Sequence, residues 1–328
     1  HALPHRPAHC PGQAGHAAHL AGRLRHNTLR MEGFPVVGDW VAIASSPEAV
    51  ALIHAVLPRK SHFSRNAAGP RTQMQVLAAN IDTVFLMTAL DEDFNPRRLE
   101  RYVAVGFDSG AQPVLLLTKA DCCPDADSYL ARARMAAAAV PVHAVSAVTG
   151  EGLEALWAYM RPALSVALLG PSGVGKSTLL NRLLGHEVQK TQGVRDFDHR
   201  GRHTTTHREL FFLPNGAMVI DTPGLRELGL WADEDSLDRT FDDIDALAPG
   251  CRFPDCRHHQ EPDCAVRGAV ATGRLDPERL ASYLKLRHEL EVLEVRKDEK
   301  ARRLHEKSLG RDLAVRRQEV RRNKPGSR

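Results

Sequence analysis

The eight residues from Gly170 to Ser177 read Gly-Pro-Ser-Gly-Val-Gly-Lys-Ser and match the pattern G-x4-G-K-[ST]. Glycines in such a loop let backbone N–H groups surround a polyphosphate, the lysine neutralises its β and γ oxygens, and the serine hydroxyl coordinates Mg²⁺. An apolar run precedes the motif and a helical run follows it, as this chemistry requires. The pattern predicts a nucleoside triphosphate site formed by Gly170, Pro171, Ser172, Gly173, Val174, Gly175, Lys176, Ser177 and Thr178.

A second set of residues that suits phosphate chemistry lies downstream. The residues at 221–224 read Asp-Thr-Pro-Gly and follow an apolar run. We expect Asp221 to act on Mg²⁺ through water and the N–H of Gly224 to face the γ-phosphate. The polar stretch at 201–206, Gly-Arg-His-Thr-Thr-Thr, suits a mobile switch whose threonine closes on Mg²⁺ while the γ-phosphate is present. Thr205 is the expected ligand, with Thr204 as the alternative.

Two further motifs indicate which base is bound. The residues at 118–121, Thr-Lys-Ala-Asp, end an apolar run and resemble the [NT]KxD guanine signature of translation-type GTPases. The Asp121 carboxylate can accept from both N1–H and the 2-amino group of guanine, which adenine cannot offer, while the lysine stem packs over the base. A Ser-Ala pair at 146–147 also ends an apolar run and resembles the motif that supports guanine in the same families. Together these motifs predict a guanine pocket formed by Thr118, Lys119, Asp121, Ser146 and Ala147.

The residue after the Asp-Thr-Pro-Gly motif bears on catalysis. Many GTPases have a water-orienting glutamine there, whereas this chain has Leu225, which can neither donate nor accept. Unaided hydrolysis should therefore be slow. Our hypothesis is that His203, beside the switch threonines, helps to position the attacking water, with Lys176 and Thr205 as the other catalytic residues. The alternative is a purely structural switch histidine.

A compact group of cysteines and histidines suggests a metal site. Cys251, Cys256, His258 and Cys264 follow the spacing C-x4-C-x-H-x5-C, the ligand set of a closed tetrahedral zinc site. The intervening residues are too polar for a core strand, which weighs against three buried free cysteines. Because no open coordination position is needed, we expect a structural zinc rather than a catalytic one. His259 is the alternative histidine ligand.

The elements that must position these motifs alternate between strand and helix. Such alternation predicts a doubly wound α/β domain over residues 76–230. The strand-like runs lie at 81–87, 114–117, 142–145, 165–169, 210–213 and 217–220, and helical patterns lie near 97–107 and 126–139 and begin at Gly152 and Lys176.

The regions on either side differ in composition. Residues 1–21 are rich in His, Ala, Pro and Gly without apolar periodicity and predict a disordered segment. Residues 22–75 contain short apolar runs broken by turn residues and predict a small β-barrel of OB type. Residues 231–295 predict an α-helical zinc-binding domain. Residues 296–328 predict a basic helical tail with 13 Lys+Arg against 5 Asp+Glu, which suits a polyanionic partner or, alternatively, a solvated helix.

The order of the motifs is unusual, because both guanine motifs precede the phosphate loop, whereas ordinary GTPases place them after it. This order is a circular permutation. With the cysteine cluster, and with the runs Val-Gly-Asp-Trp-Val at 37–41, Leu-Pro-Arg-Lys at 57–60 and Ala-Asn-Ile-Asp at 79–82, the chain resembles the circularly permuted GTPases of small ribosomal subunit biogenesis (RsgA, also called YjeQ). The resemblance implies rRNA binding through barrel and zinc domain, and hydrolysis stimulated by the small (30S) subunit during its late maturation.

The sequence thus predicts a multidomain α/β GTPase that converts GTP to GDP and phosphate with one structural Zn²⁺ and with Mg²⁺ bound beside GTP. No run approaches the length of a membrane-spanning helix, and no secretory signal stands at the start, so we expect a cytoplasmic protein without a membrane partner, and a monomer. One alternative is an ATP-dependent P-loop enzyme with a zinc finger, which the guanine motifs disfavour. Another is a non-catalytic RNA-binding module, which Lys176, Ser177 and Asp221 disfavour.

Overall fold

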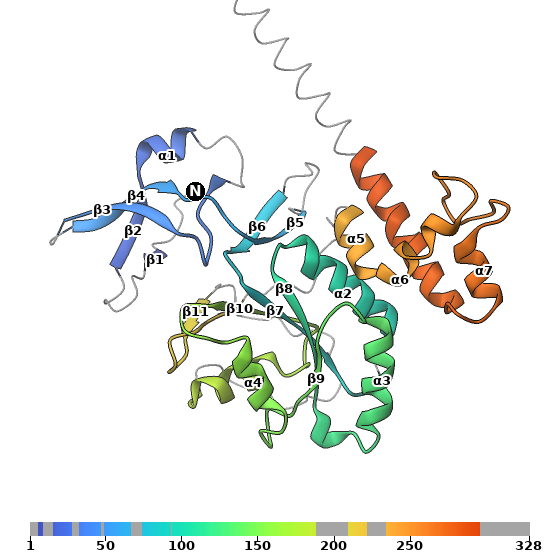
Figure 1. The fold of residues 1–328 in the computed structure, drawn as a ribbon. Helices are drawn as coiled ribbons and strands as arrows, with labels where there is room; N and C mark the ends of the chain where they lie inside the picture. Colours follow the sequence, from blue (N-terminus) through green and yellow to red (C-terminus); the bar gives the residue numbers. More distant parts are fainter. Residues whose placement is uncertain are drawn as a thin grey trace, which may run out of the picture.

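The computed structural model contains an N-terminal region of small β-sheets, a central α/β domain and a C-terminal helical region (Figure 1). This arrangement confirms the multidomain α/β architecture predicted from the sequence. The basic tail predicted at 296–328 lies outside the described residues. The structure describes residues 6–8, 16–27, 33–46, 49–66, 74–92, 94–187, 209–221 and 234–295.

A six-stranded sheet forms the centre of the molecule, in the order β11-β12-β10-β7-β8-β9. Five of its strands are parallel, and β11 pairs antiparallel with β12 at one edge. Every residue of β7 and β10 is buried, as expected for parallel strands that are covered on both faces. The strands are β7 (Thr83–Ala89), β8 (Gln112–Thr118), β9 (Val142–Ala144), β10 (Ser165–Leu169), β11 (Glu209–Phe212) and β12 (Met218–Asp221).

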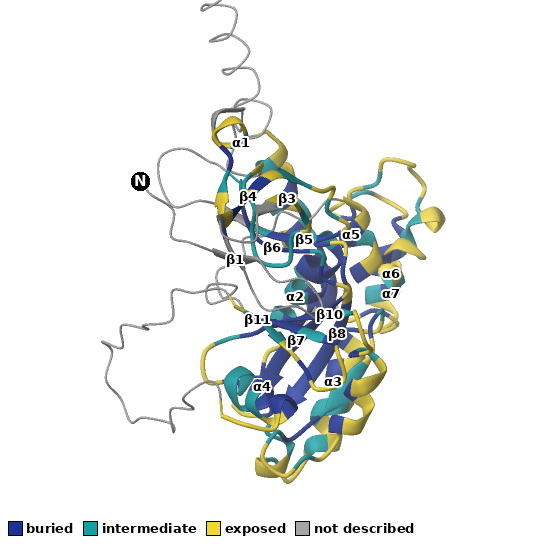
Figure 2. Cartoon of the chain, turned by 90° about the vertical axis from the view of Figure 1, so that its left-hand side faces the viewer, coloured by how far each residue is buried: buried dark blue, intermediate teal, exposed yellow. Residues whose placement is uncertain are grey.

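Successive side chains of the strands enter two separate cores on the two faces of the sheet. Leu86 of β7 belongs to one core cluster, and its neighbours Phe85 and Met87 belong to the other. Helices α2 (Pro96–Asp108) and α3 (Ala126–Ala136) pack on the first face, and α4 (Lys176–Leu184) packs on the second. Figure 2 shows the strands as a buried interior between these layers. The predicted doubly wound domain is therefore confirmed.

Two helices are shorter than the sequence pattern predicts. The helix expected over 126–139 ends at Ala136, since Ala137 caps it with non-helical backbone of φ −128° and ψ 45°. The helix expected from Gly152 is a short 3₁₀ segment, η3 (Leu153–Ala158), which Gly152 opens with a left-handed φ of 72°. Neither change moves the motifs that end the strands.

The N-terminal strands form two separate sheets. The order of the first is β1-β2-β4-β3, and α1 (Gly22–Asn27) follows β2. Strand β2 pairs with β4 and lies within the segment 1–21 that was expected to be disordered, so ordered structure begins earlier than predicted. The described pairings do not close a barrel, and the OB-type barrel stays a prediction. The strands are β1 (Arg6–Ala8), β2 (His16–Leu20), β3 (Val41–Ser46), β4 (Ala49–Val56), β5 (His62–Asn66) and β6 (Met74–Ala79).

A turn at Gly38 joins the N-terminal region to the central domain. Its φ is +86°, and a Cβ at this position would lie 2.1 Å from the carbonyl oxygen of Ala79, so only glycine fits without a backbone shift. Asn80 holds the turn, since its Nδ2 donates to Gly38 O at 3.0 Å and its Oδ1 accepts from the Lys60 N–H at 3.0 Å. The runs at 37–41, 57–60 and 79–82 therefore meet at one joint, where the chain enters β7.

The C-terminal region is helical and packs against α2. Its elements are α5 (Glu234–Thr240), α6 (Asp242–Asp245), η5 (Ala248–Gly250), α7 (Ala265–Ala271) and an unlabelled helix over residues 277–295. Leu237 and Phe241 share a core cluster with Leu99 and Val103 of α2, so this region is fixed on the first face of the central domain. In the part of the chain that the structure describes, no helix is long and apolar enough to cross a membrane.

Arg279 connects the C-terminal region to the central domain, and all five of its N–H donors are satisfied. Its guanidinium binds Asp243 with two hydrogen bonds of 2.7 Å and reaches the carbonyl oxygen of Thr240 at 3.1 Å. On the other side it donates to Glu100 Oε1 of α2 and to the carbonyl oxygen of Ala136 after α3, each at 3.2 Å. Arg279 is 5% exposed and Glu100 is fully buried, so loss of Arg279 leaves the buried Glu100 carboxylate with Arg97 as its remaining ion pair and its charge less well compensated.

We expect Arg279→Ala to lower the free energy of unfolding by about 3–5 kcal/mol, the usual cost of breaking a buried ion pair on one side. Urea titration of the full chain would measure it. Arg252→Ala is the matched control, because its ion pair with Asp263 is exposed and should contribute about 1 kcal/mol at most. An equal decrease in the free energy of unfolding in the two variants would show that Arg279 does not stabilise the contact between the regions.

Candidate functional site

The motifs singled out in the sequence converge at the carboxyl end of the parallel sheet. Strands β7, β8 and β9 follow one another in one direction, after which the chain returns to place β10 beside β7 and β12 beyond it. The order of the strands therefore reverses between β10 and β7. In open α/β sheets a ligand binds outside the carboxyl ends of the strands at such a reversal.

The phosphate loop leaves the end of β10 and enters α4 at Lys176. Gly170 lies so close to β7 that a Cβ there would be 2.5 Å from the carbonyl oxygen of Met87. Gly175 caps α4 with a φ of +99°, a conformation that favours glycine. The Lys176 ammonium lies across the loop and donates to the carbonyl oxygens of Gly170 and Pro171 at 2.8 and 2.7 Å. The loop carbonyl oxygens thus hold the Lys176 ammonium at the place where phosphates would bind.

The remaining loop residues occupy the positions that the motif requires. Val174 is buried, which anchors the loop in the second core, while Ser172 and Gly173 are exposed at its tip. Ser177 and Thr178 stand in the first turn of α4. The amino end of α4 therefore points its N–H groups and its positive dipole toward the loop, as an anion site needs.

The guanine motif begins at the end of β8, two strands away from the phosphate loop. Lys119 adopts left-handed backbone with φ 61°, and its ammonium lies 3.7 Å from the carboxylate of Asp91, which follows β7. Asp121 is exposed in the short 3₁₀ turn η2 (Ala120–Cys122). Hydrogen bonds from Ser146 and then from Cys122 hold the pKa of Asp121 below its usual value. The carboxylate is therefore ionised at neutral pH and available as an acceptor.

The Ser-Ala motif at 146–147 lies directly beside the guanine motif. Ser146 is fully buried; its hydroxyl accepts the N–H of Thr149 at 3.1 Å, and its own N–H donates to the carbonyl oxygen of Glu151 at 2.9 Å. The Ala120 N–H donates to the carbonyl oxygen of Val145 at 3.2 Å. Because Ser146 also binds Asp121, the two motifs form one hydrogen-bonded unit. Ala147 is half-buried next to it.

Thr118 connects the guanine motif to the phosphate loop. Its hydroxyl lies 2.7 Å from the carbonyl oxygen of Val174 and 3.2 Å from that of Thr88 at the end of β7. A hydroxyl has one proton to donate, and the shorter contact is the one to the phosphate loop. Thr118 is 5% exposed, so its side chain joins the two loops. No local sequence pattern indicates this contact, because 56 residues separate the partners.

Asp221 is the last residue of β12, beside β10, and is half-buried. The parallel register that pairs Ala167 with Ile220 brings the end of β12 to the edge from which the phosphate loop leaves. Asp221 and Lys176 therefore belong to neighbouring strand ends. The other switch residues expected from the sequence, His203, Thr204, Thr205 and Gly224, lie outside the described residues.

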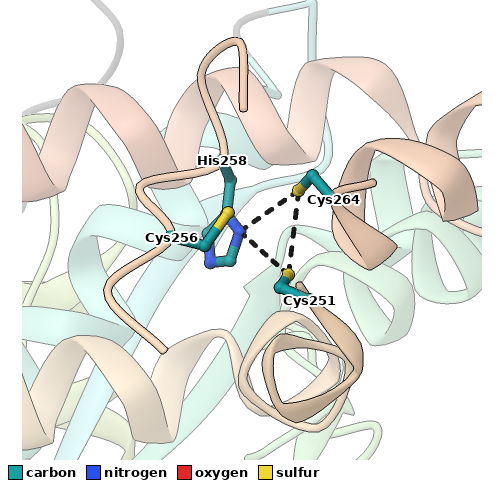
Figure 3. A group of neighbouring side chains, drawn as sticks. All are labelled: Cys251, Cys256, His258 and Cys264. Carbon is teal, nitrogen blue, oxygen red and sulfur yellow. Dashed lines mark hydrogen bonds between the residues drawn. The ribbon is translucent and has the colours of Figure 1, made fainter. Parts of the chain in front are cut away.

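A second candidate site lies in the C-terminal region, where four side chains from one loop and the start of α7 converge (Figure 3). Their ligand atoms all lie within 4.8 Å of one another. His258 Nδ1 is 3.6 Å from Cys251 Sγ and 3.4 Å from Cys264 Sγ, and the two sulfurs are 3.8 Å apart. With Cys256, these residues form a cluster that could hold a metal ion.

The backbone around this cluster explains which histidine takes part. His258 has a left-handed φ of 62° and is 4% exposed, whereas His259 is exposed. The loop is held by Glu261, whose carboxylate accepts the N–H groups of Arg257, His259 and Gln260. These bonds, together with its own N–H, hold the pKa of Glu261 at about 2. The loop geometry thus brings His258 to the cysteines and leaves His259 outside.

The thiols of the cluster differ in their surroundings. Burial raises the pKa of Cys251, but the backbone N–H groups of Val266 and Ala265 at the start of α7 outweigh it, so the net pKa is lowered. Burial raises the pKa of Cys256 to about 11. A divalent cation would compensate three thiolates in so small a space, because ligands must deprotonate to bind it. The donor set of three sulfurs and one imidazole fits a metal.

Comparison with known proteins agrees with this geometry. The family model described as RsgA GTPase matches residues 56–231, more than half of the chain. The chain is 53% identical over 282 residues to the small ribosomal subunit biogenesis GTPase RsgA of Opitutus terrae, a match that covers 83% of this chain and 77% of that protein.

Solved structures show the same fold. YjeQ from Thermotoga maritima matches with a TM-score of 0.64 at 26% identity, over 84% of this chain and 90% of that chain. YloQ, described as a circularly permuted GTPase, matches with a TM-score of 0.62 at 23% identity, over 85% and 88% of the two chains. With its guanine motifs ahead of its phosphate loop and all of them at one edge of the sheet, the chain belongs to the RsgA family of GTP-hydrolysing enzymes.

Proposed function

We propose that this enzyme hydrolyses GTP during the maturation of the small ribosomal subunit. The observation that carries the proposal is the hydrogen-bonded unit at the carboxyl edge of the sheet. Ser146 holds the guanine-reading Asp121, and Thr118 ties their strand to the phosphate loop at Val174. The site can therefore bind the base and the triphosphate of one nucleotide at the same time.

Guanine selectivity follows from the state of Asp121. Its two oxygens have room for about four hydrogen bonds, of which Ser146 and Cys122 use two. The others can accept N1–H and the 2-amino group of guanine. Adenine presents no matching pair of donors, so it would leave the ionised carboxylate unsatisfied. The aliphatic stem of Lys119 would cover the base, with its ammonium placed by Asp91.

The phosphate side supplies charge and position. Lys176, which the loop carbonyls already hold, would neutralise the β and γ oxygens, and the N–H groups at the start of α4 would surround them. Ser177, Asp221 and Thr205 are the residues we assign to Mg²⁺, with Thr204 as the alternative. When bound, Mg²⁺ supplies charge neutralisation between the β- and γ-phosphates. Gly224 would donate its N–H to the γ-phosphate.

Hydrolysis needs a group that orients water, and we assign this role to His203. Leu225 stands where a glutamine would act, and a leucine side chain can form no hydrogen bond. An imidazole beside the switch threonines can accept a proton from the attacking water, or it can hold that water in line with the γ-phosphate. The partner that orders this segment would then set the rate of turnover.

For the metal in the C-terminal cluster we propose zinc, in a structural role. Tetrahedral zinc with bonds of about 2.3 Å to sulfur and about 2.0–2.1 Å to nitrogen places two sulfurs roughly 3.8 Å apart, and a sulfur roughly 3.5 Å from the nitrogen. The observed separations of 3.8, 3.6 and 3.4 Å agree with these values. All four positions would be filled by Cys251, Cys256, His258 and Cys264, leaving none open for catalysis.

The relative in Opitutus terrae carries the name of a small ribosomal subunit biogenesis GTPase, and at 53% identity we extend that role to this chain. The partner would be the small subunit and its rRNA, contacted through the N-terminal region and the zinc region. The subunit would stimulate hydrolysis by ordering the switch that carries His203. We further propose that the enzyme acts as a monomer in the cytoplasm, where subunits mature, and binds no membrane.

Asp121→Asn should weaken GDP binding roughly 100-fold or more, because the amide offers one acceptor and one donor where guanine needs two acceptors. The same change should improve binding of XDP, since xanthine has a carbonyl where guanine has its 2-amino group. Titration with fluorescent GDP and XDP would measure both. Asp91→Asn is the control, which should change GDP affinity less than about fivefold for an exposed contact. Equal affinity of the wild type for ATP and GTP would refute the assignment.

His203→Ala should leave GTP affinity unchanged and lower turnover stimulated by small subunits about 100-fold or more, the usual effect of losing a general acid–base group. His207→Ala, four residues along the same segment, should keep the stimulation. Lys176→Ala should reduce both affinity and turnover. Phosphate release with and without purified subunits gives the rates, and a His203→Ala enzyme with normal turnover would disprove the role.

Purified protein should contain one zinc per chain, and Cys256→Ser or His258→Ala should lower that content together with the melting temperature. GDP binding should persist in these variants, because the nucleotide loops belong to a different part of the fold. Cys123→Ser and His259→Ala are the matched controls and should retain the metal. Metal analysis combined with thermal unfolding would decide, and loss of zinc from His259→Ala alone would reassign the fourth ligand.

A further inference from the structure

Two large apolar side chains are exposed side by side at one end of the N-terminal sheet. Trp40 is 54% exposed just before β3, and Leu57 is 47% exposed just after β4. The Leu57 N–H donates to the Trp40 carbonyl oxygen at 2.9 Å, which continues the antiparallel register that pairs Val41 with Val56. Residues directly opposite in such a ladder project from the same face.

The neighbours of Trp40 on this face are small. The next pair in the register on the same side is Ala42 with Ala55, of which Ala42 is exposed and Ala55 half-buried. Alanine side chains are too short to cover an indole ring. Solvent therefore reaches an aromatic surface that has an aliphatic side chain, Leu57, beside it. A single exposed leucine is ordinary, but a tryptophan left open at half its area is unusual.

The residue before Trp40 is a fixed, neutralised carboxylate. Asp39 receives two hydrogen bonds of 2.7 Å from the Arg59 guanidinium and one of 2.8 Å from the Val36 N–H. Its side chain is 1% exposed. This paired charge holds the backbone at Trp40 in place without presenting a negative charge to a ligand.

The charge around the exposed ring favours a polyanion. Among the described side chains of residues 16–66, Asp39 is the one carboxylate, whereas Lys60 is exposed. Lys60 lies three residues after Leu57, at the same end of the sheet. An exposed aromatic face with a cation nearby is the arrangement that proteins use for single-stranded nucleic acid, because every base offers a π-face and the cation meets a phosphate. Paired bases inside a duplex offer no such face.

We propose that Trp40 is a stacking platform for an unpaired base of RNA, with Leu57 beside the base and Lys60 contacting its backbone. This inference rests on the proposed function, since it names the chemistry by which the N-terminal region would recognise rRNA. It adds that the RNA is single-stranded at the point of contact and that its sequence is not read by hydrogen bonds from Trp40.

The test is fluorescence anisotropy of the full chain with a labelled adenylate decanucleotide. Trp40→Ala should weaken binding about 5- to 150-fold, the range for one lost base–aromatic stack, while Trp40→Phe keeps a ring and should lose less. Trp157→Ala is the matched control, because Trp157 is 40% exposed on η3 of the central domain. Lys60→Gln should reduce the salt dependence of binding by about one phosphate contact.

Equal affinity of wild type and Trp40→Ala for the decanucleotide, or no binding by the wild type, would overturn the platform. So would a Trp40→Ala variant that loses small subunits but keeps the decanucleotide, because Trp40 would then contact protein. Subunit-stimulated GTP hydrolysis by the wild type is measured separately. Its absence would refute the proposed function while a Trp40-dependent affinity for RNA would still support the platform.

Discussion

The hydrogen bond from the Thr118 hydroxyl to the carbonyl oxygen of Val174 joins two loops that the chain order separates by more than 50 residues. This contact, with the bond between Ser146 and Asp121, fixes the loops that follow β8, β9 and β10 relative to one another. The parallel sheet makes both possible, because it brings the carboxyl ends of neighbouring strands together whatever their order along the chain. Permutation therefore changes the connections and leaves the site intact.

What permutation does change is the attachment of the flanking regions. The chain enters the sheet at β7 from the joint at Gly38, and it leaves from Asp221 at the end of β12. The C-terminal region that follows is held on the central domain by Arg279, which bonds Asp243 and Thr240 within that region and donates across the boundary to Glu100 and to the Ala136 carbonyl oxygen.

A buried ion pair is also found in the N-terminal region. A bidentate ion pair between Arg59 and Asp39 neutralises a carboxylate that would otherwise repel a polyanion, and the next residue, Trp40, is left exposed. In the C-terminal region, Glu100 is buried with Arg279 and Arg97 beside it, and burial raises the pKa of Glu100 against the opposing effects of Ser282 and the arginines. Of these two buried ion pairs, Arg279–Glu100 joins two regions and Arg59–Asp39 fixes the backbone within one.

The sequence by itself determined the phosphate loop, the guanine motifs, the cysteine cluster and the doubly wound order, because each depends on residue types at short, fixed spacings and on the local period of apolar residues. It could not determine contacts between distant segments, such as Thr118 with Val174 or Arg279 with Glu100, since nothing local records them. It predicted His258 as the ligand with His259 as the alternative, and the left-handed backbone and burial of His258 place that residue in the cluster. Tertiary structure chose the partners, because burial and hydrogen-bond satisfaction are properties of the packed chain and not of any one segment.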